Sequence, residues 1–257
     1  MTASLFADSY TIWLREMTRF RRNRAYIVSQ LAFPVLMIVL VALPIGALVP
    51  TELMGGRFSG GIGISGFLAS GFLVMSIAGS SFSGGINLTT ERKEGFLREI
   101  VVAPVSRSSI ILGKVAARIT VALVQTLLIV GALFAFTDLG LYAPLLLLAS
   151  IVFISFIFVS LGLLMAAFLQ DAESFTIVTG FVMLPVYLLS GALFPVDQIP
   201  VVGTIARGNP MYYGVNLFRH AVTGLESLLT LNLVALLALA VAAFALATLV
   251  FDRWLKA

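Results

Sequence analysis

The side chains that could carry out chemistry are concentrated in residues 89–107, whose sequence is TTERKEGFLREIVVAPVSR. Seven of these nineteen residues are charged, in a chain in which Asp, Glu, Lys and Arg together make up 11%. The acids Glu91, Glu94 and Glu99 alternate with basic and apolar residues. The segment contains no clustered nucleophile, base and orienting group, so its residue types favour contact with a protein partner over catalysis.

Other candidates for chemistry are weak. His220 is the single histidine and cysteine is absent, so neither a thiolate metal site nor a Ser-His catalytic pair is indicated. Gly113-Lys114 lacks the glycine spacing and the following Ser or Thr of a P-loop. GIGISG, residues 61–66, formally matches a dinucleotide fingerprint, but it opens an apolar run with no preceding strand and fits helix packing better. We expect no enzyme active site, metal or cofactor in this chain.

Composition indicates a membrane protein. Of 257 residues, 60% are hydrophobic, and the mean hydropathy is +1.08. A soluble fold could not bury so much apolar surface. The net charge of +4 does not indicate nucleic-acid binding, because the basic residues flank apolar runs.

Six apolar stretches are long enough to cross a bilayer as helices. They are Tyr26–Val49, Ile62–Ile86, Ser109–Phe136, Tyr142–Leu169, Ser174–Phe194 and Leu228–Val250. Pro34, Pro44 and Pro185 lie inside these stretches and are expected to kink the helices. The sequence therefore predicts an all-α polytopic membrane protein with six transmembrane helices.

The basic residues predict the orientation. Thirteen of the sixteen Lys and Arg residues fall on one side of a six-span arrangement. The positive-inside rule assigns that side to the cytoplasm, so both termini and residues 89–107 are expected there, in a cell membrane.

The first predicted span is preceded by an amphipathic segment, residues 4–24. Trp13 and Phe20 belong to its apolar face, whereas Arg15, Glu16 and Arg19 belong mainly to the opposite face. This pattern predicts a helix in the cytoplasmic interface, with its arginines on anionic lipid. The alternative is a solvated basic tail.

Residues 195–226 are too polar for a span and too apolar for an exposed loop. Prolines and glycines interrupt this segment, which also carries Asp197, Arg207, Arg219 and His220. We expect two short re-entrant helices in the outer leaflet, covered by protein.

Residues 88–107 predict a short coupling helix at the cytoplasmic surface. Thr90 can cap this helix, with Glu91 near its positive end, and Glu94 and Arg98 have the spacing of an i,i+4 ion pair. Pro104 then marks a break before the third span. Such a helix could dock a soluble partner; a solvated loop is the alternative.

Two blocks of sequence resemble the permease subunits of type-2 ABC exporters, the group with drug, nodulation-factor and polysaccharide export permeases. The first block matches their cytoplasmic signature at Glu91, Arg92, Glu94, Gly95, Leu97, Pro104, Ser106, Arg107, Gly113 and Lys114. The second matches their outer-leaflet elements at Ser190, Gly191, Phe194, Pro195, Pro200, Asn209, Pro210 and Arg219.

The resemblance implies one permease domain over residues 1–257, working as a dimer with two separate ATPase subunits that bind ATP and Mg. ATPase contacts would come from Thr90, Glu91, Arg92, Glu94, Gly95, Phe96, Leu97, Arg98, Glu99 and Pro104. Trp13, Arg15, Arg19 and Phe20 would form the interfacial helix, and Pro195, Asn209, Pro210 and Arg219 an outer gate. The substrate would pass near spans one, two and five.

One position departs from the family. Many members have an acidic residue where this chain has Arg98, with Glu99 following, so the ion pairs with the partner are expected to differ. The function implied is ATP-driven export of an amphipathic, lipid-linked or drug-like substrate. The alternatives are an ion-coupled secondary transporter and a membrane-embedded enzyme, although the sequence lacks mid-membrane acids and a catalytic cluster.

Overall fold

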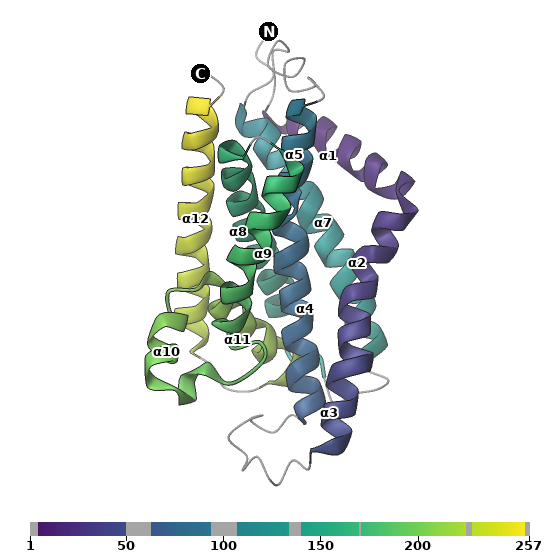
Figure 1. The fold of residues 1–257 in the computed structure, drawn as a ribbon, viewed down its shortest axis with the longest axis vertical. Coiled ribbons are helices and arrows are strands. Elements are labelled where there is room, and N and C mark those ends of the chain that lie inside the picture. Colours follow the sequence, from purple (N-terminus) through teal and green to yellow (C-terminus); the bar gives the residue numbers. More distant parts are fainter. Residues whose placement is uncertain are drawn as a thin grey trace.

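The computed structural model describes residues 5–49, 63–93, 107–133, 140–169, 171–224 and 228–254, and these parts are helices and their connections (Figure 1). The membrane-length helices follow the long apolar runs. They are α2–η1–α3, which together cover Arg24–Leu48, then α4 (Ile64–Phe82) with α5 (Gly84–Lys93), α7 (Arg107–Leu133), α8 (Pro144–Phe168) and α12 (Leu229–Trp254).

The polytopic helical fold is confirmed, but the number of full-length spans differs from the prediction. Five helices in the described part of the chain are long and apolar enough to cross a membrane. The predicted fifth span, Ser174–Phe194, was too long: α9 covers only Ala172–Leu188. The chain turns after this helix, and Gly191 adopts a positive φ of 77° that ends helical geometry. The apolar sequence continues beyond the point where the helix stops.

The first span is irregular between its two prolines. α2 (Arg24–Met37) contains Pro34, the π-helical segment η1 covers Ile38–Ala42, and α3 (Leu43–Leu48) has Pro44 in its first turn. A proline removes one helical N–H donor, and a π-bulge is a common way to accommodate such a defect. The helix therefore continues past both prolines instead of breaking.

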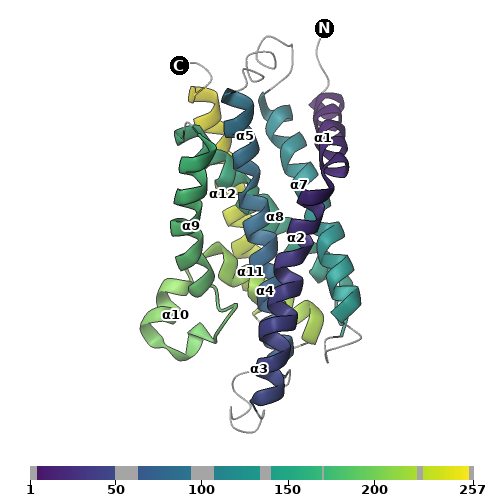
Figure 2. The same ribbon diagram turned by 45° about the vertical axis from the view of Figure 1, so that its right-hand side comes forward.

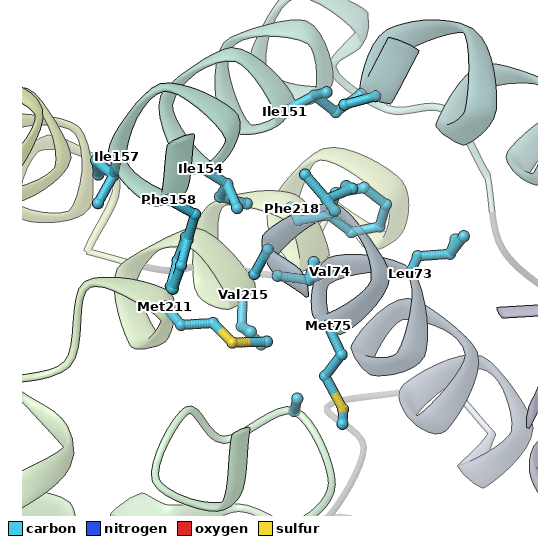
Figure 3. Packing of buried hydrophobic residues seen from close by; sticks show 14 of the residues in the cluster. Leu73, Val74, Met75, Ile151, Ile154, Ile157, Phe158, Met211, Val215 and Phe218 are labelled. Carbon is cyan, nitrogen blue, oxygen red and sulfur yellow. The ribbon is translucent and has the colours of Figure 1, made fainter. Parts of the chain in front are cut away.

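The core of the bundle forms where α4, α8 and α11 (Pro210–Thr223) meet. Figure 3 shows Val74 of α4, Ile154 and Phe158 of α8 and Val215 of α11 converging in this core. Close packing needs glycine at Gly162, where a Cβ would lie 2.1 Å from the backbone oxygen of Phe82. In contrast to α4, α2 and α12 have few buried residues.

The two ends of the bundle carry different elements. Figure 1 places α1 (Leu5–Arg22), the end of α5 and the end of α12 at one end of the molecule. The short helix α10 (Pro200–Ala206) and α11 lie toward the other end. The segments that the sequence predicts to be cytoplasmic and outer therefore begin at opposite ends of the bundle.

Candidate coupling site and outer clamp

The amphipathic helix predicted at the N-terminus exists as α1 and packs along α7. The two helices approach closely at Gly113, where a Cβ would meet the Cβ of Ile12 at 2.7 Å and the backbone oxygen of Ser9 at 2.8 Å. Trp13 adds a hydrogen bond from its Nε1 to the Thr120 hydroxyl at 3.0 Å. Glycine at this position of the signature therefore allows a surface helix to lie directly on the bundle.

A buried ion cluster lies beside this contact and joins three helices. Lys114 of α7 donates to Glu91 of α5 at 2.8 Å and to Glu16 of α1 at 3.2 Å. Arg15 donates to Glu91 at 2.8 Å, and Arg19 approaches the same oxygen at 3.4 Å. Glu91 is 3% exposed and Lys114 is 5% exposed. Each buried charge depends on its partners, because a lone charge at such a site would be strongly destabilising.

The cluster also sets the ionisation of Glu16. Burial by itself would raise the pKa of this carboxyl group, but the charges and hydrogen bonds of Lys114 and Arg15 outweigh burial and lower the pKa below its usual 4.5. Glu16 is therefore an anion at neutral pH, as the ion pairs require.

The predicted coupling residues separate into two groups. Thr90 and Glu91 lie within α5, which extends the second span, and the Thr90 hydroxyl donates to the backbone oxygen of Ile86 at 3.1 Å. The expectation that Thr90 caps a new helix is wrong, because the chain is already helical there. Arg92 lies in the last turn of α5. The other predicted residues lie outside the described part of the chain: Glu94, Gly95, Phe96, Leu97, Arg98, Glu99 and Pro104.

The predicted interfacial residues do not all have the partners expected from the sequence. The arginines Arg15 and Arg19 direct their guanidinium groups to Glu91, whereas the sequence suggested contacts with lipid. Phe20 packs edge-on against Tyr26, with ring centroids 5.8 Å apart. A separate stripe of α1 stays exposed and consists of Phe6, Tyr10 and Leu14. This stripe, one helical face at i, i+4 and i+8, is the surface suited to contact the bilayer.

The predicted outer gate forms a compact clamp. Asn209 is the N-cap of α11, since its Oδ1 accepts from the Met211 N–H, and its Nδ2 donates to the Val186 oxygen at 2.7 Å. Pro210 occupies the first helical position, where its missing N–H costs nothing. Pro195 precedes the 3₁₀ turn η3, Val196–Gln198. Asn209 thus ties α11 to α9.

Arg219 completes this clamp from the C-terminal half of α11. Its guanidinium donates to the backbone oxygens of Gly191 at 2.8 Å and Ala192 at 2.9 Å, and it stacks over the Phe67 ring at 3.6 Å. The turn at Gly191 and Ala192 packs closely against α4 at Gly71, where a Cβ would lie 2.1 Å from the Ala192 oxygen. Arg219 therefore joins α4, α11 and the turn that follows α9.

Residues of α2, α4 and α9 line a groove. Figure 2 shows α4 between α2 and α9. Its cavity volume is about 430 Å³. Apolar side chains line the groove together with hydroxyl groups, including Phe33, Met183 and Tyr187. The hydroxyls of Ser80 and Ser83 donate to backbone oxygens of their own helix, which leaves a mainly apolar wall.

Sequence reasoning missed the structural roles of Glu16 and Lys114. Lys114 was noted as part of the signature, and Glu16 was placed on the charged face of the N-terminal helix. The signal was the single acid among the arginines of residues 15–22, because an acid on a basic face needs a specific partner. Its partner Lys114 lies 98 residues away in sequence.

Membrane-length helices, a surface helix tied to them and a clamp at the opposite end define a polytopic membrane protein. The chain belongs to the ABC-2 type transporter family, whose model matches residues 8–223, and it is a permease domain of that family. The permease domain of this family has no ATPase site. It is 28% identical over 221 residues to Nodulation protein J of Rhizobium leguminosarum bv. trifolii, covering 83% of this chain and 80% of that protein. The bv. viciae protein of the same name is 28% identical over 219 residues, covering 83% and 81%.

Proposed function

We propose that this permease exports an amphipathic, lipid-linked or drug-like substrate as a dimer driven by two separate ABC ATPase subunits. Membership of the ABC-2 family carries this proposal, because permeases of that family pair with ABC ATPases. Both termini and the α5 end of the bundle then face the cytoplasm, as the basic residues of the sequence favour.

The ATPase contact is assigned to residues 92–104 that follow Glu91, with Phe96, Leu97 and Glu99 as the main contacts. Glu91 itself has an internal role in this proposal, since its carboxylate already binds Lys114, Arg15 and Arg19. Movement imposed on residues 92–104 would reach α1 and α7 through this ion cluster. Nucleotide must bind the two transport conformations with different affinity for such movement to drive export.

The groove between α2, α4 and α9 is the proposed substrate path, completed by a second copy of the chain. Its lining by Phe33, Met183 and Leu184 suits an apolar moiety. The exposed apolar faces of α2 and α9, including Leu36, Phe181 and Leu188, would lie against the second copy or lipid. The clamp at Arg219 would shape the outer end of the path.

Transport by inverted membrane vesicles tests this proposal. Vesicles that contain this chain and its ATPase should accumulate a fluorescent cationic or lipid-like dye with ATP, in the presence of a protonophore. Control vesicles in which the Walker lysine of the ATPase is replaced should not accumulate the dye. Accumulation that follows a proton or sodium gradient without ATP would instead identify a secondary transporter.

A further inference from the structure

A polar hollow lies where α1, α2, α5 and α7 meet, and the proposed export function does not account for it. Its cavity volume is about 110 Å³, and its polar lining includes Arg19, Asn23, Tyr26, Asn87 and Arg118. Since one liquid water occupies about 30 Å³, the hollow can hold a group as large as a few waters, such as a phosphate.

Arg118 is the principal cation of this hollow. It donates a short hydrogen bond to the Tyr26 hydroxyl, and its guanidinium carbon lies 5.8 Å from the centroid of that ring. Gly84 gives it room, because a Cβ there would lie 3.2 Å from Arg118 Nε. Among the described residues Arg118 forms no ion pair. A guanidinium stays charged in proteins, and its planar fork matches the oxygens of a phosphate.

The surrounding charges leave a positive excess. Within the described residues, the cations that line the hollow are Arg19 and Arg118. Glu16 also lines the hollow, but its Oε1 accepts from Arg15 and Lys114 and is neutralised by them. An anion in the hollow would therefore compensate the excess.

The hollow lies at the level where a lipid head group would be. The first span begins at Arg24, two residues before Tyr26, and basic and aromatic residues are typical of this level of a membrane. One turn deeper on the same helices the groove begins: Ser29 follows Tyr26 on α2, and Ser83 precedes Asn87 on the α4–α5 segment. A polar pocket followed by an apolar-lined groove matches the head and the tail of a lipid.

We propose that this hollow binds the phosphate of an anionic phospholipid from the inner leaflet, with Arg118 and Arg19 as its ligands and one acyl chain directed into the groove. Bound there, the lipid would join α1 to α2 and α7. The acyl chain would then form part of the wall of the groove that is proposed as the substrate path, whereas the head-group site itself rests only on the hollow.

Lipid retention measured by native mass spectrometry tests the site. The full-length chain is extracted from nanodiscs that contain phosphatidylglycerol and phosphatidylcholine in equal amounts. We expect one phosphatidylglycerol to be retained in preference to phosphatidylcholine. Arg118→Gln should reduce this retention about tenfold or more, as expected when a charged hydrogen-bond pair is lost. Arg24→Gln is the matched control, an exposed arginine at the same level that does not line the hollow.

A second variant distinguishes loss of the lipid site from misfolding of the protein. Arg19 is half exposed, so Arg19→Gln should fold normally, which its melting temperature can confirm, and should still reduce retention. Equal retention of both lipids, or equal losses in Arg118→Gln and Arg24→Gln, would overturn the proposal. Displacement of phosphatidylglycerol by millimolar inorganic phosphate, with phosphate then bound in its place, would also overturn it by identifying a free-phosphate site.

Discussion

Lys114 Nζ lies 2.8 Å from Glu91 Oε2, and both side chains are buried at the junction of α1, α5 and α7. Sequence resemblance suggested that Glu91 contacts the ATPase. In the structure its two oxygens are occupied by Lys114, Arg15 and Arg19 of the same chain. The signature residues Glu91, Gly113 and Lys114 therefore fix α1 to the bundle beside α5.

Replacing Lys114 should destabilise this junction. Lys114→Gln leaves Glu91 and Glu16 without their buried cation, and breaking a buried ion pair from one side costs about 3 kcal/mol. We expect the apparent melting temperature in detergent to fall by several degrees. Arg22→Gln, an exposed arginine of α1, should leave it nearly unchanged. If Lys114→Gln and Arg22→Gln have the same apparent melting temperature, the ion cluster does not stabilise the fold.

The approach of α1 to α7 depends on Gly113. Gly113→Val should displace α1, because even a Cβ would lie 2.7 Å from the Cβ of Ile12 and 2.8 Å from the Ser9 oxygen. Trypsin should then cleave at the arginines of α1 several-fold faster. Gly131→Ala lies on the same helix with no atom within 4 Å of the new Cβ, and it should not change the cleavage rate. A protected α1 in Gly113→Val would contradict the assigned packing.

Lowering the pH below 4.5 should release α1 from the bundle. The pKa of Glu16 is lowered in the folded protein, so its ionisation stabilises the folded state above its usual pKa of 4.5. That stabilisation is lost as pH falls below 4.5 and through the lower folded value. The fluorescence of Trp13, recorded in a Trp254→Phe background, should therefore be constant from pH 8 to 5 and change below 4.5. A transition centred above pH 5 would contradict the role given to Glu16.

The outer clamp depends on the geometry of an arginine. Arg219→Lys keeps the charge but cannot donate at once to the Gly191 and Ala192 oxygens and stack on Phe67. We expect a loss of about 1–3 kcal/mol, typical of unsatisfied polar groups, together with reduced transport. Arg207→Lys, a substitution at an exposed arginine at the end of α10, is the matched control. Full stability and transport in Arg219→Lys would show that the clamp is not needed.

The helical architecture could be predicted because long apolar runs have few alternatives in a bilayer. The end of α9 could not be predicted, because the sequence stays mostly apolar through Leu193 while the backbone turns at Gly191. Thr90 was assigned to a cap because its residue type suits one, but residues 86–93 contain no glycine or proline that would end the preceding helix. Glu16 and Lys114 meet across about a hundred residues, and spacing along the chain cannot show such a pair.

Copurification of the ATPase tests the proposed function most directly. The chain should be coexpressed with an ABC ATPase encoded beside it, in three forms: unaltered, Leu97→Ala with Glu99→Gln, and Gly131→Ala as a folding control. We predict that the unaltered and Gly131→Ala chains retain the ATPase in equal amounts. The Leu97 and Glu99 variant should lose the ATPase while keeping its melting temperature and its elution volume. An ATPase that never copurifies, or that binds all three forms equally, would contradict an ATP-driven permease coupled through residues 92–104.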